Sequence, residues 1–372
     1  MPPYDAFLLV SFGGPEGPDD VIPFLRNVTR GRGVPPGRLE QVAEHYYRFG
    51  GVSPINQQCR DLIAAVEKDF AAAGIALPVY WGNRNWDPYL ADAVRAMAAG
   101  GVRRALAFVT SAYSSYSGCR QYLDDIEVAR AQAGPAAPRI DKIRPYFNHP
   151  GFVEPLAAST RRAIESLPVS VSDNAEIVFT AHSIPAGMAA ASGPGGRGAY
   201  QAQLAEAAGL VAERVGGGRR WRLAYQSRSG PPSQPWLGPD VGDCLTELAG
   251  AGARAVVLVP VGFVSDHMEI RFDLDVEAAE TAGRLGLPLA RAATPGTDPA
   301  FIAMITELVR ERLNDAPRAA LGDLGVLPDR CPAGCCAARP AAQARQPAAQ
   351  AGQPAAQAGQ PAAQARQPGA QR

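Results

Sequence analysis

Eight short runs rich in valine, isoleucine, leucine and aromatic residues alternate with alanine-rich stretches of helical period along most of this chain. Such alternation is typical of βα units, whose parallel strands are buried on both faces of a sheet. The runs fall into two sets of four, namely Ala6–Phe12, Pro78–Gly82, Ala105–Thr110 and Ile140–Arg144, then Glu176–Ala181, Arg222–Gln226, Ala255–Val261 and Pro288–Ala292. The sequence therefore predicts an α/β fold with two parallel four-stranded sheets.

The two sets also resemble each other. In the first set, Trp86 precedes Gly101-Val-Arg with a helical stretch between them, and in the second set Trp236 precedes Gly252-Ala-Arg in the same way. We infer two similar domains, residues 1–150 and 151–320, with a cleft between them. Two unrelated stretches remain the alternative, because alanine-rich helices before Gly-x-Arg strands are common.

The end of the chain has a different composition. A cysteine-containing extension, residues 321–338, is followed by a repeat of proline, alanine and glutamine over residues 339–372. The repeat has a period of seven, but it contains no large apolar residue and its prolines interrupt any helix. We expect residues 339–372 to be a disordered tail outside the fold.

Composition limits the class of partner. Hydrophobic residues make up 47% of the 372 positions, and the 36 Lys and Arg residues equal the 36 Asp and Glu residues. This balance argues against binding to nucleic acid or to an anionic membrane, and favours a small molecule. The longest apolar run, Ala255–Val264, is about half the length of a membrane span. Without a transmembrane segment or a signal pattern, we expect a soluble cytoplasmic protein, in which clustered cysteines more often indicate metal than disulfides.

Two polar side chains follow predicted strands of the second set. His182 comes directly after Glu176–Ala181 and just before Ser183-Ile-Pro185, while Glu269 follows the strand Ala255–Val261. Open α/β sheets bind their ligands at the carboxyl ends of the strands. A histidine and a glutamate with an open side suit proton transfer or a transient divalent ion, so both are candidate catalytic residues and metal ligands. A structural histidine remains the alternative for His182 alone.

Three acidic residues continue from this point. Glu269, Asp273 and Glu277 are four positions apart, which would place them on one face of a helix. This line of carboxylates would suit a path for protons or a cation, although a solvated acidic face is the alternative. His267 precedes Glu269 by two positions, and we expect it to orient the site.

Glycine-rich segments do not indicate a nucleotide. Gly193–Gly198 matches the dinucleotide string, but the preceding strand ends too early to form the phosphate-binding turn. In Gly50-Gly51-Val52-Ser53-Pro54, Ser53 is interpreted either as a cap or as a donor to a ligand carboxylate. Aromatic and arginine side chains, among them Tyr46, Tyr122 and Arg84, would suit a flat apolar ligand with carboxylates.

Five motifs together resemble the ferrochelatase family. They are Ser11-Phe-Gly-Gly-Pro, Gly50-Gly-Val-Ser-Pro, Phe179-Thr-Ala-His-Ser-Ile-Pro, Gln226-Ser-Arg-Ser-Gly-Pro-Pro with Pro235-Trp-Leu-Gly-Pro, and Pro260-Val-Gly-Phe-Val-Ser-Asp-His-Met-Glu. The resemblance implies two Rossmann-like domains, the chelatase fold, and insertion of Fe2+ as substrate into a porphyrin with release of two protons. It implies that His182 and Glu269 handle metal and protons, and that Ser53 and Tyr122 bind the porphyrin.

The sequence most resembles the actinobacterial branch, which implies coproporphyrin III as the substrate and iron coproporphyrin III (coproheme) as the product in haem biosynthesis. Some relatives in that group have a tyrosine where this chain has Phe12. Protoporphyrin IX remains an alternative substrate, as do a cobalt or nickel chelatase and a porphyrin or haem carrier without turnover. The resemblance also allows transient contact with neighbouring haem-synthesis enzymes.

The cysteines add a second candidate centre. Some ferrochelatases bind a [2Fe-2S] cluster through one internal and three C-terminal cysteines. Here the resemblance places Cys119 near the internal ligand and Cys331, Cys335 and Cys336 at the C-terminal positions, although the adjacent pair departs from the expected spacing. Three exposed thiols without a cluster are the alternative.

Overall fold

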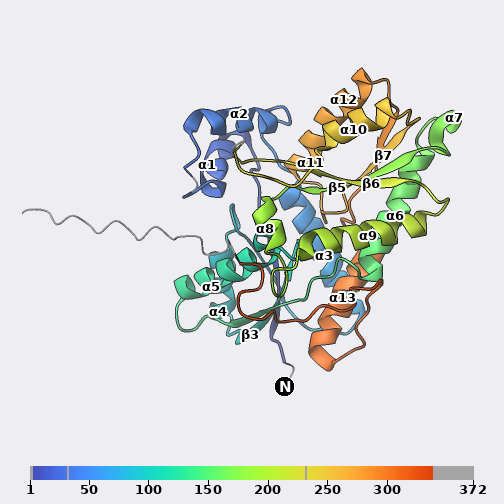
Figure 1. Cartoon of the computed structure of the whole chain (residues 1–372). Helices are drawn as coiled ribbons and strands as arrows, with labels where there is room; N and C mark the ends of the chain where they lie inside the picture. The colour runs from blue at the N-terminus through green and yellow to red at the C-terminus, as the bar shows by residue number, and fades with distance from the viewer. Residues whose placement is uncertain (1–2, 32, 231–232, 338–372) are drawn as a thin grey trace, which may run out of the picture. The chain divides into compact units, whose positions relative to one another are not determined.

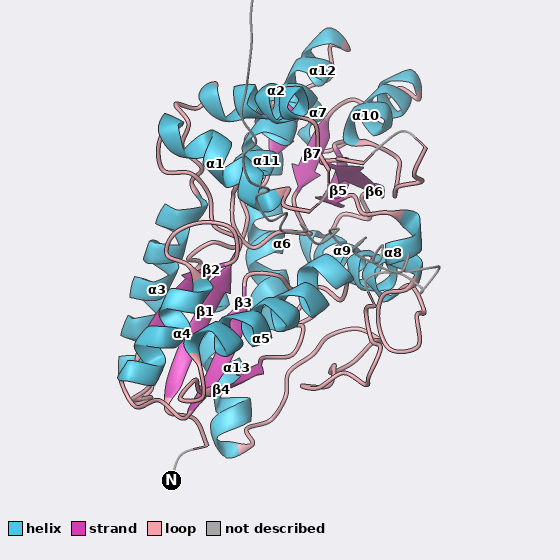
Figure 2. Cartoon of the chain, turned by 90° about the vertical axis from the view of Figure 1, so that its left-hand side faces the viewer, coloured by secondary structure: helices cyan, strands magenta, loops and turns pink. Residues whose placement is uncertain are grey.

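The computed structural model describes residues 3–31, 33–230 and 233–337 (Figure 1). The expected disordered tail, residues 339–372, and the last residue of the predicted extension lie outside the described residues. Two parallel sheets form the framework, and Figure 2 draws them as separate groups of strands. The first contains β1 (Ala6–Ser11), β2 (Val79–Asn83), β3 (Arg104–Val109) and β4 (Arg139–Lys142). The second contains β5 (Glu176–His182), β6 (Trp221–Gln226), β7 (Val256–Val259) and β8 (Leu289–Arg291).

Both sheets have the same strand order. The first runs β2-β1-β3-β4 and the second runs β6-β5-β7-β8, with every pairing parallel. All eight predicted strands are confirmed to within two residues at each end, as are the two parallel four-stranded sheets. The repeated order agrees with the internal similarity of the sequence. The division into domains at residue 150 stays a prediction; β4 ends at Lys142 and the next helix begins at Pro150.

Helices and two π-helical segments connect the strands. Before residue 150 they are α1 (Pro18–Val28), α2 (Pro36–Tyr47), α3 (Ile55–Ala72), α4 (Leu90–Ala99), η1 (Tyr116–Arg120) and α5 (Gln121–Ala133). After it come α6 (Pro150–Glu165), α7 (Val169–Ser172), α8 (Ala186–Ala190), α9 (Ala199–Val215), α10 (Val241–Gly250), α11 (Met268–Phe272), η2 (Asp273–Ala278), α12 (Ala279–Arg284) and α13 (Pro299–Asn314).

Each sheet is buried on both faces, which explains why its strands are apolar throughout. In β1, Phe7 and Leu9 face the largest buried cluster, while Leu8 and Val10 face a second cluster with α4 and α5. This alternation follows the two-residue period of a strand. The outer face of the second sheet packs against α10 and α12 in the same way.

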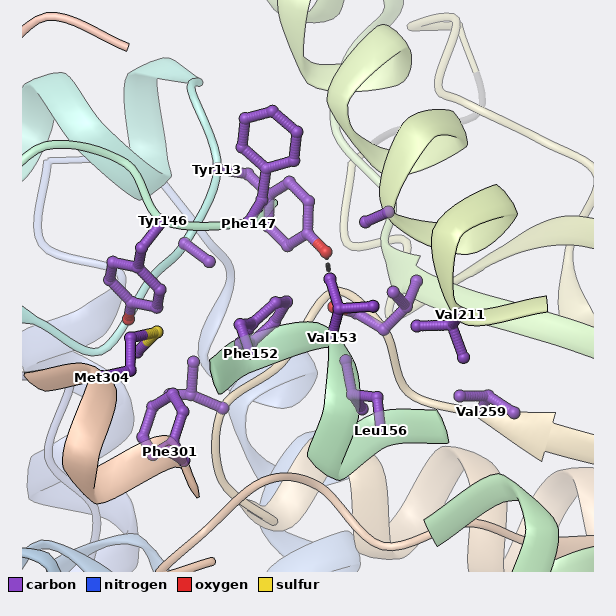
Figure 3. Packing of buried hydrophobic residues seen from close by; sticks show 14 of the residues in the cluster. Tyr113, Tyr146, Phe147, Phe152, Val153, Leu156, Val211, Val259, Phe301 and Met304 are labelled. Carbon is purple, nitrogen blue, oxygen red and sulfur yellow. Dashed lines mark hydrogen bonds between the residues drawn. The ribbon is translucent and has the colours of Figure 1, made fainter. Parts of the chain in front are cut away.

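The largest buried cluster contains residues of both sheets. Figure 3 shows part of it, where Phe152 of α6 lies near Tyr113 and Phe301. The Tyr113 hydroxyl donates a hydrogen bond to the carbonyl of Val261 over 2.7 Å, so a polar contact accompanies the apolar ones. Burial of each large aromatic side chain here contributes roughly 1.5–3 kcal/mol to folding.

The segment that follows α13 is held by polar contacts, one set buried and one set nearer the surface. The Arg144 guanidinium, fully buried, donates to both carboxylate oxygens of Glu311 at 2.8 Å and to the carbonyl of Ala319. Further along, the Glu206 carboxylate accepts from the amides of Asp323 and Leu324 at 2.9 and 2.8 Å. These contacts order an irregular segment up to the C-terminal cysteines.

His149 gives the fold a pH dependence that can be tested. Its Nδ1 accepts a hydrogen bond from the amide of Gly151 at the start of α6, and burial, with a smaller effect of Arg144, lowers its pKa from 6.5 to about 4. His149 therefore binds a proton more readily in the unfolded chain than in the folded one. Its contribution to stability is complete above pH 6.5 and is lost as pH falls toward 4.

We predict that His149→Asn, which keeps a capping acceptor without a titrating group, reduces the loss of stability on acidification. Between pH 7 and pH 5 the free energy of unfolding should fall by about 2 kcal/mol more in the unmodified protein than in the variant. Urea unfolding at both pH values measures this difference. Equal pH dependence in the two proteins would contradict the role given to His149.

Candidate functional site

Hydrogen bonds on both sides fix the backbone of His182 at the end of β5. His182 pairs in register with Gln226 of β6, and the amide of Ser183 donates to the Gln226 carbonyl at 2.8 Å. The Tyr200 hydroxyl donates to the His182 carbonyl at 2.9 Å, and the Ser183 hydroxyl donates to the carbonyl of Leu237 at 2.8 Å. These hydrogen bonds hold the turn after the strand, so the backbone that carries the imidazole is fixed in position.

Glu269 is brought to His182 by the turn after β7, the strand next to β5. Gly262 in this turn lies so close to β5 that a Cβ atom on it would come within 2.7 Å of the Cβ of Ala181. Only glycine allows that approach. The chain then reaches His267, whose Nδ1 accepts from the amide of Glu269 at 3.2 Å and caps α11.

The two side chains form a contact between His182 Nε2 and Glu269 Oε2 at 3.4 Å. His182 Nδ1 lies 2.5 Å from the carbonyl oxygen of Ser183, so this nitrogen carries a proton and donates. The side chains are 34% and 46% exposed, respectively. The two side chains therefore have a fixed orientation, both can ionise, and both are exposed enough for a ligand to reach them.

Charge separation is favoured in this pair. Burial opposes ionisation of both groups and is the largest single influence, but mutual attraction and hydrogen bonding outweigh it. As a result the pKa of His182 rises to about 9 and the pKa of Glu269 falls to about 2. At neutral pH the resting pair is an imidazolium beside a carboxylate. His267 differs, because burial and the charge of His182 lower its pKa despite the opposing effect of Glu269.

Asp273 lies next to this pair and has a different protonation state. The Oδ2 atom of Asp273 accepts a hydrogen bond from the Ser227 hydroxyl. The side-chain amide nitrogen of Gln226 lies 3.4 Å from the same oxygen. Burial, followed by the charges of Glu269 and Glu277, raises the pKa of Asp273 to about 7, although the Ser227 hydrogen bond acts in the opposite direction. Asp273 can therefore gain or lose a proton near neutral pH.

The three acidic residues Glu269, Asp273 and Glu277 lie in a segment whose helix geometry changes. The predicted regular helix is replaced by α11, the π-helical η2 and α12, so a spacing of four does not describe one straight face. Glu269, Asp273 and Glu277 nevertheless stay within electrostatic range, since the two glutamates both act on Asp273. Glu277 is exposed. Single π-helical turns inside α-helices are frequent at functional sites.

Sequence reasoning missed the groups that hold this segment in place. Ser227, which positions Asp273, has a φ of +60°, in the left-handed region that non-glycine residues seldom adopt. Met268 packs in a buried cluster with Phe24 of α1 and Tyr46 of α2. Burial and the nearby charges of Glu269 and Asp273 raise the pKa of the Tyr46 hydroxyl, which stays protonated. The motif around Gln226 was visible in the sequence, but its contact with Asp273 was not.

Ser53 and Tyr122 lie at the carboxyl edge of the first sheet instead. Ser53 is buried against Gly14, and its amide donates to the carbonyl of Pro15 at 2.8 Å, so two glycine motifs meet there. Tyr122 is buried beneath Arg84, whose guanidinium carbon lies 4.4 Å from the ring centroid. The same Arg84 lies 5.9 Å from the ring of Phe12, which is 37% exposed.

Four cysteines from distant parts of the sequence converge at a separate place. Cys119 of η1 is hydrogen bonded to Cys331, which also contacts Cys335, and the sulfurs of Cys335 and Cys336 are 3.8 Å apart. Interaction with Cys331, followed by the charges of Lys142 and Arg120, lowers the pKa of Cys119 despite burial. All four line a cavity of about 270 Å³. Across the described ranges, no set of three or more His, Cys, Asp or Glu side chains is arranged to hold a metal ion.

Comparison with known proteins identifies the family. The family model described as ferrochelatase matches residues 4–313. The chain belongs to the ferrochelatase family. A coproporphyrin III ferrochelatase of Streptomyces coelicolor is 55% identical over 353 residues, covering 91% of this chain and 94% of its own. One of Frankia alni is 58% identical, covering 89% and 86%, and a protein of Rhodopirellula baltica named ferrochelatase is 54% identical, covering 90% and 94%.

A solved structure shares the fold of this ferrochelatase-family chain. SirB from Bacillus subtilis with Fe3+ has a TM-score of 0.51 and 12% sequence identity, covering 84% of this chain and 96% of its own. At that identity the likeness concerns the fold alone, which agrees with the predicted chelatase fold. Within the described residues, no helix is both long and apolar enough to cross a membrane.

We predict that Glu269→Gln lowers the pKa of His182 from about 9 toward the ordinary value of 6.5 or below, because burial then acts without the opposing carboxylate charge. Imidazole resonances followed by NMR over pH 5 to 10 measure the shift. Glu280→Gln, an exposed change on α12, serves as the control and should leave the titration of His182 unaltered. An unchanged His182 pKa in Glu269→Gln would contradict the pairing.

Proposed function

We propose that this chain inserts Fe2+ into coproporphyrin III and releases two protons, forming iron coproporphyrin III in haem biosynthesis. Membership of the ferrochelatase family supports the reaction, and the names of several highly similar relatives support the substrate. One observation carries the proposal: His182 and Glu269 meet at the end of β5, next to a carboxyl group whose pKa is about 7.

The resting charges of the pair suggest how the reaction begins. Protonated His182 can neither accept a pyrrole proton nor bind Fe2+. An approaching Fe2+ ion adds positive charge beside the imidazolium and favours loss of its proton, while the Glu269 carboxylate attracts the ion. His182 and Glu269 then become available to hold the metal or to take protons from the macrocycle.

Asp273 and Glu277 would serve as the path between the pair and solvent. Asp273 can accept a proton at neutral pH and release it again, because its pKa lies near 7. Glu277 is exposed and can pass that proton to water. The same carboxylates can guide Fe2+ inward, since oxygen ligands attract a hard cation.

The porphyrin would be held by residues at the carboxyl edge of the first sheet. We propose Ser53 and Tyr122 as contacts, which the family resemblance implies. Both are buried, so more exposed groups such as Phe12 would pack on the macrocycle above them. Phe12 offers no oxygen ligand, so axial ligation of the iron by this residue does not form part of the proposed function.

Protoporphyrin IX is the second candidate substrate, with protohaem as the direct product. The relative from Rhodopirellula baltica is named ferrochelatase without the coproporphyrin designation, and this name favours protoporphyrin IX. A carrier without turnover is less well supported, because it gives no purpose to the titrating carboxylate beside His182.

A [2Fe-2S] cluster is a further part of the proposal, with Cys119, Cys331, Cys335 and Cys336 as its ligands. Thiolates are the ligands such clusters require, and the lowered pKa of Cys119 favours its thiolate form. Loading would have to rearrange the thiols, since these side chains are not arranged for a metal ion as they stand. When bound, the cluster would supply a redox-sensitive crosslink between Cys119 and the extension.

We also propose the domain division inferred from the sequence, with residues 1–150, 151–320 and an extension over residues 321–338. The repeated strand order of the two sheets supports the first two. A cytoplasmic location and transient contact with neighbouring haem-synthesis enzymes complete the proposal. The location agrees with the reducing conditions that Fe2+ and free thiols require, and the family resemblance allows the contact.

The decisive assay is an anaerobic initial-rate measurement of Fe2+ insertion with coproporphyrin III and protoporphyrin IX at equal concentrations. We predict faster metallation of coproporphyrin III. We further predict that His182→Ala and Glu269→Gln each reduce turnover by at least about tenfold while porphyrin binding, followed by fluorescence quenching, is retained. Near-normal turnover in either variant would contradict the site, and preference for protoporphyrin IX would replace the substrate.

The cluster makes a separate prediction. Protein purified without oxygen should contain iron and sulfide and absorb visible light, and Cys331→Ser should lose that absorption. Cys59→Ser and Cys244→Ser change buried cysteines outside this group and should retain it. A colourless unmodified protein without sulfide would contradict the cluster but not the chelatase reaction.

A further inference from the structure

Cys336 is bonded to a loop that belongs to the second sheet. The backbone amide of Gly193, between α8 and α9, donates a hydrogen bond to the Cys336 sulfur at 3.1 Å, and this contact is buried. Cys336 has a φ of +53°, a left-handed conformation that is costly for a residue with a side chain. The sulfur is therefore held against Gly193 at some expense in backbone conformation.

From Gly193 a chain of contacts leads to His182. Gly193 packs so closely on α9 that a Cβ atom would come within 2.4 Å of the Ala199 Cβ. The neighbouring Ser192 hydroxyl accepts from the amide of Tyr200 at 2.8 Å. The Tyr200 side chain crosses back to β5, where its hydroxyl donates to the His182 carbonyl at 2.9 Å.

We propose that Cys336, Gly193, Ser192 and Tyr200 form a relay through which the contact between the Cys336 sulfur and Gly193 sets the position of His182. Tyr200 is thus a positioning residue for the iron-insertion site, and Cys336 anchors the loop that holds Tyr200. This inference rests on the proposed function for the role of His182, but the relay itself is a structural coupling that exists with or without turnover.

The Cys336 sulfur is the buried acceptor at one end of this chain of contacts. Without it, the buried amide of Gly193 loses this hydrogen-bond partner. The loop that holds the Tyr200 amide then loses a restraint.

Amide hydrogen exchange tests the coupling without relying on activity. Exchange is followed by mass spectrometry at Gly193 and at Ser183, whose amide bonds to Gln226 directly after His182. The experiment uses full-length protein freed of iron and kept reduced. We expect Cys336→Ala to raise exchange at Gly193 and also at Ser183, about fivefold for the loss of one hydrogen bond. Cys335→Ala, which leaves the Gly193 contact intact, is the matched control and should protect both amides as the unmodified protein does.

Tyr200→Phe interrupts the relay by removing only the hydroxyl. It should raise exchange at Ser183 while leaving Gly193 protected, and adding Cys336→Ala to it should change Ser183 no further. Tyr225→Phe, a buried tyrosine of β6 without a bond to the His182 carbonyl, is the control. In the Fe2+ assay, Tyr200→Phe should raise KM for Fe2+ about fivefold with unchanged porphyrin binding.

The outcomes separate the two proposals. If Cys336→Ala loosens Gly193 but leaves Ser183 protected, or if its effect on Ser183 persists undiminished in Tyr200→Phe, the relay is wrong. If the unmodified protein inserts no iron, the proposed function fails, while the exchange pattern still decides whether the relay exists. A change of KM for Fe2+ in Tyr200→Phe without any change in exchange at Ser183 would also overturn the relay, because the effect would then bypass the backbone of His182.

Discussion

The charged contact between His182 and Glu269 depends on the close approach of two adjacent strands. His182 ends β5 and Glu269 follows β7, and Gly262 permits the turn after β7 to lie directly on β5. A side chain at that position would separate the two elements and with them the imidazole and the carboxylate. The opposite pKa shifts of His182 and Glu269 follow from this proximity.

Electrostatics then divides the neighbouring groups between two protonation states. Glu269 stays ionised because His182 compensates its charge, so Asp273 meets a carboxylate that does not readily take a proton. Burial and this neighbouring charge raise the pKa of Asp273 into the neutral range. Ser227 and Gln226 hold its carboxylate without removing that effect. Two similar acids therefore have different roles, set by their surroundings rather than by residue type.

The cysteine group connects the extension to the same framework. Cys119 belongs to η1, which follows β3 of the first sheet, whereas Cys336 contacts the loop after α8. The extension also bonds to Glu206 of α9 and to Arg144, which follows β4. In the proposed relay, three hydrogen bonds connect the Cys336 sulfur to Tyr200 and His182.

Local sequence alone determined the eight strands and their division into two sets, because strands buried on both faces require continuous apolar runs such as that of β1. It also singled out His182 and Glu269, since polar groups after such runs stand at a sheet edge. Tertiary structure decided the π-helical register of Asp273, the contacts of Ser227 and Tyr46, and the convergence of Cys119 with three residues from the opposite end of the chain. These depend on packing between segments far apart in sequence, for which no local pattern of residues carries a signal.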